Sequence, residues 1–348
     1  MRRYLVMYAI ASLAVAMTGF AQSGPYKILK TAKVGGAGGF DYVNADASGR
    51  RLYVARSGTP ARITVFNLDT LAPTGEIPDV GAHGAVVSTK SGHGFASSKP
   101  VTMFDPKTLA VIKKIEVEGN PDGMMYDPFN DRVWVLSHRA PHATVINASD
   151  GSIAGTLDIG GAPEQAATDG KGHVYIDVED KDNIAVIDAK ALTVTGHYDI
   201  AGKGGTCAGL ALDAKNNVLF ATCRNPANMV MVNAADGKII ATLPIGVGTD
   251  GAAFNPDTKE ALSSQGDGTL TIVKENSPTS FEVEQTLTTM VSAKTLTLDS
   301  KTGHILLIGA EFAAPPAPAT PPPAGGRGGR GGRGQMVPDS FTILEVGK

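Results

Sequence analysis

The sequence has little of what most enzymes and nucleic-acid-binding proteins need. It contains no HExxH zinc motif, no Walker loop, no GxSxG nucleophile elbow and no CxxCH haem motif. Helical periodicity is scarce, and there are only two cysteines and one tryptophan. The formal net charge of −3 is not that of a basic nucleic-acid-binding domain, so we expect no nucleic-acid partner.

In contrast, turn residues are abundant and a repeat runs through the chain. Glycine accounts for 42 residues and proline for 21 of the 348. A strand–turn–strand pattern over residues 40–56 returns six more times, at intervals of 39 to 44 residues. The first residue of each second strand marks the repeat: Leu52, Gly94, Val133, Val174, Val218, Ala261 and Ile305.

Each repeat continues with a second pair of strands, and the third strand commonly ends in Asn or Asp, as in residues 63–67 and 184–188. A period of about 40 residues with four short strands is typical of a β-propeller, with one blade per repeat. The sequence therefore predicts an all-β fold, a seven-bladed β-propeller that forms a single domain over residues 22–348.

The last repeat has only three strands of its own, and the third covers residues 340–346. A further strand, residues 26–34, precedes the first repeat, and we expect it to complete the last blade and close the ring. Residues 313–338 interrupt that blade with a run rich in Pro, Gly and Arg, which has almost no apolar side chain to bury. We expect this loop to be disordered.

These motifs carry a family resemblance. The repeats have a sequence pattern that resembles the YVTN-type, YncE-like repeat family of seven-bladed β-propellers. The pattern is G-x-x-P-(D/E), followed by Asp, by (L/V)-Y-V and by an (I/V)-x-V-(I/F)-(D/N) strand. The resemblance covers residues 27–346. It implies the propeller fold, while members of such families serve in binding, structural and enzymatic roles.

The N-terminus has the pattern of an export signal. Arg2 and Arg3 precede an apolar run over residues 5–17, and residues 19–21 form a small-x-small cleavage site. We expect a signal peptide over residues 1–21, no membrane span after its cleavage, and a periplasmic or secreted protein.

The two cysteines fit such an oxidising compartment. With Leu212 placed opposite Val218 in the hairpin of the fifth repeat, Cys207 faces Cys223 across the strand pair. We expect a structural disulfide between them.

Candidate site residues come from aligning the start of each first strand, eleven residues before its marker. Two repeats need a shift of one residue, which replaces Pro163 by Glu164 and Cys207 by Ala208. The innermost strands of a propeller line its central channel, so these side chains should meet at one channel mouth. The predicted ligand-binding residues are Asp41, His83, Asp122, Glu164, Asp250 and Lys294.

The loops between second and third strands should add residues on the same face: Arg56, His138, Arg139, Glu179 and Arg224. His138 and His142 lie four residues apart, but in a propeller loop we expect them to be solvated. Three interpretations of the mouth remain open. It can be a polar, water-filled opening, a site for a small molecule or peptide, or a site for a divalent cation.

These observations favour an exported, monomeric binding or interaction module that takes a small molecule or a protein partner at the channel mouth. The family resemblance implies two alternatives, a lactonase-like hydrolase and an accessory subunit of a periplasmic oxidoreductase. In the hydrolase, a metal at Asp41, Asp122, Glu164 and Asp250 would activate water, with His83 as the general base.

Overall fold

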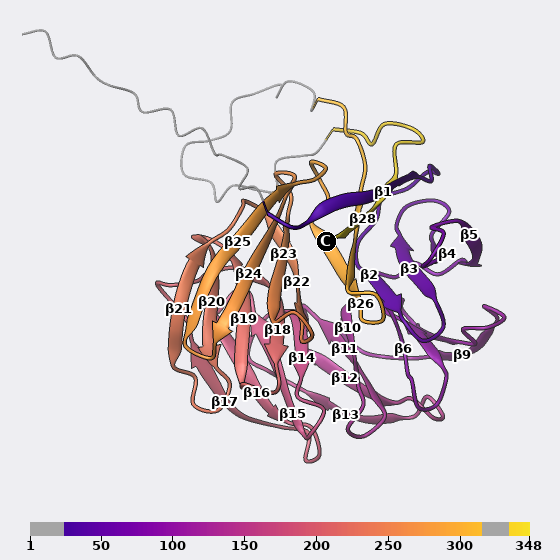
Figure 1. The fold of residues 1–348 in the computed structure, drawn as a ribbon. Coiled ribbons are helices and arrows are strands. Elements are labelled where there is room, and N and C mark those ends of the chain that lie inside the picture. The colour runs from indigo at the N-terminus through magenta and orange to yellow at the C-terminus, as the bar shows by residue number, and fades with distance from the viewer. Residues whose placement is uncertain (1–23, 315–333) are drawn as a thin grey trace, which may run out of the picture.

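Seven four-stranded antiparallel sheets arranged around a common axis make up the molecule, as shown by a computed structural model that describes residues 24–314 and 334–348. The chain is a seven-bladed β-propeller, and Figure 1 shows the blades following one another from indigo to orange. The expected signal peptide, residues 1–21, lies outside the described residues. So do residues 315–333 of the loop that we expected to be disordered.

The first three complete blades follow the order of the sequence. Blade 1 consists of β2 (Val43–Asp46), β3 (Arg51–Arg56), β4 (Arg62–Asn67) and β5 (Pro73–Pro78). Blade 2 consists of β6 (Ala85–Val87), β7 (Gly94–Ala96), β8 (Val101–Phe104) and β9 (Val111–Ile115). Blade 3 consists of β10 (Pro121–Asp127), β11 (Arg132–Ser137), β12 (Ala143–Asn147) and β13 (Ile153–Leu157).

The next three blades repeat this order. Blade 4 consists of β14 (Pro163–Thr168), β15 (His173–Val178), β16 (Asn183–Asp188) and β17 (Thr193–Asp199). Blade 5 consists of β18 (Cys207–Asp213), β19 (Val218–Arg224), β20 (Ala227–Asn233) and β21 (Ile239–Pro244). Blade 6 consists of β22 (Thr249–Asn255), β23 (Glu260–Gln265), β24 (Thr269–Ser277) and β25 (Ser280–Thr288).

Blade 7 is built from both ends of the described chain, which confirms the predicted ring closure. Its strands are β26 (Thr295–Asp299), β27 (His304–Gly309), β28 (Thr342–Gly347) and β1 (Lys27–Lys33), in the sheet order β1-β28-β27-β26. In Figure 1 the indigo β1 runs beside β28. Tyr26, just before β1, fixes this end to blade 6. Its backbone N–H donates to Gln285 Oε1 over 2.8 Å, and its hydroxyl donates to Glu260.

The hydrophobic core is divided among the spaces between neighbouring blades. In the described residues, seven clusters of buried side chains each join one blade to the next. Trp134 of blade 3, for example, is fully buried and packs with Val174 and Ile176 of blade 4. A single blade cannot cover its own faces, so closing the ring is what buries them all.

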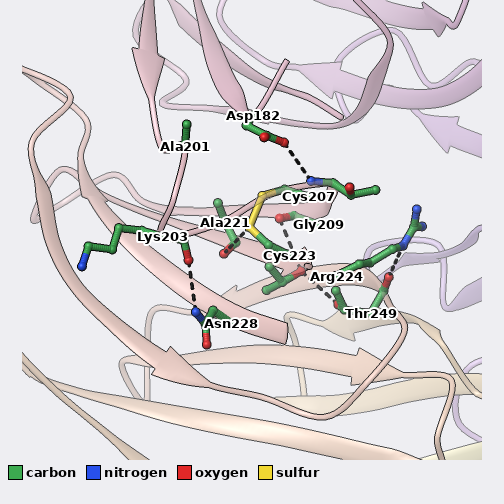
Figure 2. Close-up of a disulfide and its surroundings, with 12 residues drawn as sticks. Asp182, Ala201, Lys203, Cys207, Gly209, Ala221, Cys223, Arg224, Asn228 and Thr249 are labelled. Carbon is green, nitrogen blue, oxygen red and sulfur yellow. Dashed lines mark hydrogen bonds between the residues drawn. A yellow bond between two sulfur atoms is a disulfide. The ribbon is translucent and has the colours of Figure 1, made fainter. Parts of the chain in front are cut away.

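The disulfide between Cys207 and Cys223 is present, but the register predicted for its hairpin was wrong by one residue. Leu212 pairs with Leu219, not with Val218. A β-bulge between Cys207 and Gly209 adds one residue to β18, and this shift brings Cys207 opposite Cys223 after all. Figure 2 shows the bond joining the two strands, with Arg224 directly after Cys223.

The long insertion of blade 7 begins and ends as a paired ribbon. Phe312 pairs with Met336, and the N–H of Ala313 donates to the carbonyl of Gln335 over 2.9 Å. Among residues 24–314 and 334–348 there is no helix with the length and apolarity that crossing a membrane requires.

Candidate functional site

The channel mouth is formed where the innermost strands begin, and a recurring β-bulge shapes it. In β10, β14, β18 and β22 the pairing with the second strand shifts by one residue near the start. The shifted positions include Asp122, Glu164 and Asp250. Bulges redirect side chains, and they are frequent next to functional sites.

On one side of the mouth, carboxylates and imidazoles alternate across four blades. His83 Nδ1 lies 2.7 Å from Asp41 Oδ2 and 3.4 Å from Asp122 Oδ1. His138 Nε2 lies 3.3 Å from Asp122 Oδ2 and 3.8 Å from Glu164 Oε1. The aligned residues of blades 1 to 4 are therefore neighbours in space. His138, an outer-loop residue that we expected to be solvated, lies among these aligned residues. His142, which we also expected to be solvated, forms an ion pair with Asp158.

On the other side of the mouth, two cations are held by carboxylates. Arg224 Nη1 donates to Glu179 Oε1 over 2.8 Å, and its Nη2 donates to Asp250 Oδ1. Lys294 forms an ion pair with Asp250 Oδ2. The Arg224 Nε donates to the carbonyl of Thr249, as Figure 2 shows, so the arginine is fixed at both ends of its guanidinium. The disulfide anchors the end of β19 from which Arg224 projects.

Two of the predicted outer residues form hydrogen bonds with groups other than the carboxylates of the mouth. Arg56 is 1% exposed, and its guanidinium donates to the carbonyls of residues 35–39 and stacks 3.9 Å from the Phe341 ring centroid. It holds a loop together beside the site, and we leave it out of the proposed ligand set. Arg139 is exposed, and its backbone, through N–H and carbonyl, bonds the Ser137 hydroxyl.

Sequence reasoning missed two residues that reach into the channel. The Tyr42 hydroxyl of blade 1 donates to Glu164 Oε2 of blade 4 over 3.1 Å. Gln165 accepts hydrogen bonds from the N–H groups of Leu210 and Ala252, which ties blade 4 to blades 5 and 6. The sequence does contain a signal for Tyr42, because four of the seven repeats have glycine at the position equivalent to it. Gly84 and Gly123 leave the room that the Tyr42 side chain occupies.

Below the mouth, the inner strands enclose a cavity of about 140 Å³ lined by residues that include Tyr42, Glu164, Gln165 and Asp250. A drug-sized ligand needs roughly 300–1,000 Å³. This cavity alone fits an ion or one polar group, but it shares Asn44, Met124 and Gln165 with a further cavity of about 380 Å³, whose volume lies within that range.

Burial changes the acidity of the groups around the mouth. It raises the pKa of Glu164, whose side chain is 6% exposed, and the carboxylates of Glu179 and Asp177 raise it further, while Arg224 lowers it. Burial also raises the pKa of Asp177 to about 8. The hydrogen bond to Asp41 raises the pKa of His83, against burial, which lowers it.

Asp177 gives a first testable prediction. Its pKa is about 8 in the folded protein, against about 3.9 in an unfolded chain, so between these values only the folded state holds the proton. Stability must then fall as pH rises through this window. The raised pKa of His83 acts in the same direction. The side chain of Asp177→Asn stays neutral at every pH. We therefore expect the unfolding free energy of this variant to fall less between pH 5 and pH 8 than that of the wild type, by more than about 1.4 kcal/mol, the equivalent of one pKa unit.

The measurement is the unfolding free energy in urea at pH 5, 6, 7 and 8. The matched control is Asp150→Asn, because Asp150 lies in an exposed turn where hydrogen bonds from Ser152 lower its pKa. The unfolding free energy of Asp150→Asn should change with pH in the same way as that of the wild type. Parallel curves for wild type and Asp177→Asn would contradict the assignment.

The four-carboxylate metal site considered from the sequence is not assembled as one set. In the described residues, two groups of possible metal ligands have all their donor atoms within 4.8 Å of one another: Asp41, His83 and Asp122, and Asp122, His138 and Glu164. Asp250 belongs to neither, because it pairs with Arg224 and Lys294. The position of His83 between two carboxylates is that of a ligand or an orienting group.

Comparisons with known proteins agree with the fold. No family model matches the sequence, and no curated protein matches it. A chain of the solved structure described as "Crystal Structure of Mitotic Checkpoint Complex" is similar to this chain, with a TM-score of 0.70 and 12% identity over 88% of this chain and 95% of that one. At this identity the likeness shows the propeller fold alone.

Proposed function

We propose that this protein is an exported binding module of the YVTN, YncE-like type, whose ligand or protein partner presents a positively charged group to the channel mouth. The observation that carries the proposal is the gathering of Asp41, Asp122 and Glu164 with two imidazoles on one side of that mouth. Propellers commonly mediate interactions, and loop-built sites at one end of a rigid scaffold commonly bind ligands.

The distribution of charge supports a cationic ligand. Arg224 and Lys294 bind Glu179 and Asp250 and so neutralise the other side of the mouth. The partners of Asp41 and Asp122 include the partly exposed imidazoles of His83 and His138. A cation arriving at these two carboxylates gains attraction, and the half-exposed imidazoles can turn aside.

The cavity below the mouth supports a binding role for the rim. A cavity of about 140 Å³ accepts one polar group, while the remainder of a ligand or a protein partner lies on the surrounding loops. The disulfide agrees with an exported protein, since such bonds persist in oxidising compartments. We propose a single domain that acts as a monomer. The hydrolase alternative has less support, because Asp250, one of its proposed metal ligands, is held by Arg224 and Lys294.

The test uses cations of defined chemistry as probes: putrescine and the amide of lysyl-lysine, each titrated by calorimetry at low ionic strength. We expect at least one of these probes to bind the wild-type protein. The double variant Asp41→Asn, Asp122→Asn should bind the same probe at least about tenfold more weakly, because tenfold corresponds to about 1.4 kcal/mol of lost attraction.

The matched control carries the same change of charge at the other end of the blades. Asp150 and Asp236 lie in exposed turns between third and fourth strands, so the double variant Asp150→Asn, Asp236→Asn should bind like the wild type. Equal weakening in both double variants would mean that only net charge matters, and the proposed site would be wrong.

A further inference from the structure

We propose that the channel mouth binds a divalent transition-metal ion, of which Zn²⁺ is the type, through Asp122, His138 and Glu164. The inference deepens the proposed function and rests on it, because it names the positive charge that the mouth receives. The ion lies where loops of blades 3 and 4 meet, and its open coordination positions face the solvent at the mouth.

The three donor atoms lie within 4.8 Å of one another, and the two distances from His138 are close to those that a metal ion needs. Ligands on a tetrahedral ion with bonds of about 2.0–2.1 Å lie about 3.3 Å apart. His138 Nε2 is 3.3 Å from Asp122 Oδ2 and 3.8 Å from Glu164 Oε1. Both separations exceed a normal hydrogen bond, and the longer one closes by a small rotation of the His138 side chain, which is 35% exposed.

The groups behind these ligands hold them in place. The Tyr42 hydroxyl donates to the second carboxylate oxygen of Glu164 over 3.1 Å, which leaves Oε1 directed at the ion. His83 lies 3.4 Å from Asp122 Oδ1 and is itself held by Asp41 at 2.7 Å. The hydrogen bond from Tyr42 is of the second-layer kind that usually accompanies a metal site, and His83 adds an ion-pair contact to Asp122.

A neighbouring positive charge does not oppose the ion. Arg224 Nη1 lies 4.0 Å from Glu164 Oε1, close enough to repel a cation if its charge were free. Its guanidinium, however, bonds Glu179 through Nη1 and Asp250 through Nη2. The two carboxylates, Glu179 of blade 4 and Asp250 of blade 6, offset its charge and fix its orientation.

The donor set selects the class of metal. One imidazole with two carboxylates suits Zn²⁺ and its neighbours in the first transition row, whereas Ca²⁺ takes six to eight oxygen ligands and no nitrogen. Binding of Zn²⁺ should therefore depend on His138, whereas binding of Ca²⁺ should not.

The test is a calorimetric titration of the full chain, without a polyhistidine tag, with Zn²⁺ alone and with Ca²⁺ alone. We expect one Zn²⁺ per chain in the wild type, at least about 100-fold weaker binding in His138→Ala and at least about tenfold weaker binding in Glu164→Gln. The matched control is His142→Ala. This histidine lies in the same loop, four residues on, and bonds Asp158 instead, so its variant should bind Zn²⁺ within about threefold of the wild type.

Each outcome decides the matter. Binding of Ca²⁺ as tight as that of Zn²⁺, or equal losses in His138→Ala and His142→Ala, would overturn the inference. So would a folded wild-type protein that does not bind Zn²⁺. If that protein still binds putrescine or lysyl-lysine amide through Asp41 and Asp122, the proposed function stands and only the metal is wrong. If it binds none of these probes, both are wrong.

Discussion

A chain that begins at Gly35, and so lacks β1, is expected to lose most of its stability. Blade 7 then has three strands, and the edge of β28 loses its antiparallel pairing with residues 27–33. The Tyr26 anchor to Gln285 and Glu260 is lost as well. Because β1 completes the sheet of blade 7 and carries the N-terminal end of the chain across to it, we expect a loss of at least about 5 kcal/mol, comparable with the whole stability of a small domain.

The measurement is urea unfolding followed by the fluorescence of Trp134, which is fully buried between blades 3 and 4. The control is a chain that begins at Gly24, which keeps β1 and Tyr26 and should unfold like the full chain. A peptide of residues 24–34 added to the shortened chain should restore part of the transition, and a peptide of scrambled sequence should not. Full stability without β1 would mean that the ring does not need this closure.

The substitution Arg56→Met is expected to have the second largest effect. It keeps the apolar length of a buried side chain but removes the guanidinium donors of Arg56 to the carbonyls of residues 35–39, of which those of Ala37 and Gly39 keep a second donor. The carbonyls of Gly35, Gly36 and Gly38, which are partly buried, then lose their Arg56 donor; a fully buried carbonyl left without a donor costs about 1–3 kcal/mol, and water reaches some of these. The contact with the Phe341 ring is lost too. We expect a loss of at least about 3 kcal/mol in urea unfolding.

Two control variants separate this mechanism from a loss of charge. Arg56→Lys keeps the charge but not the planar fork of donors, so it should recover less than half of the lost stability. Arg51→Met lies at the other end of the same strand, where Arg51 bonds the carbonyls of Pro106 and Lys107 near the surface. It should change stability by less than about 1 kcal/mol. Equal losses in Arg51→Met and Arg56→Met would contradict the role of Arg56.

The blade count and the closure of the ring could be predicted because both depend on counting. Seven markers recur at nearly constant spacing, and blade 7 is one strand short within its own repeat. The short continuous apolar run in strands such as β16 indicates a strand that is buried on both faces, as the structure has it. The repeat also placed Asp41, His83, Asp122 and Glu164 at one mouth, because symmetry brings equivalent positions together.

What could not be predicted depends on single inserted residues and on single side chains. The bulge at the start of β18 leaves no mark in the sequence, so the pairing of Leu212 was placed one residue off. Arg56 was assigned to the mouth by its position at the end of a strand. It comes four residues after its marker, whereas His138 comes five after its own, and in a strand this difference turns the side chain to the other face. Tyr42 was passed over because aromatic residues in a propeller are usually part of the core.

The most direct measurement is anomalous diffraction at the zinc absorption edge from crystals soaked in Zn²⁺. We expect the strongest peak at the channel mouth, at bonding distance of about 2.0–2.2 Å from His138 Nε2, Asp122 Oδ2 and Glu164 Oε1. A mouth without a peak, in crystals where His142 or His173 at the surface carries one, would contradict the assignment of the mouth as the cation-binding site.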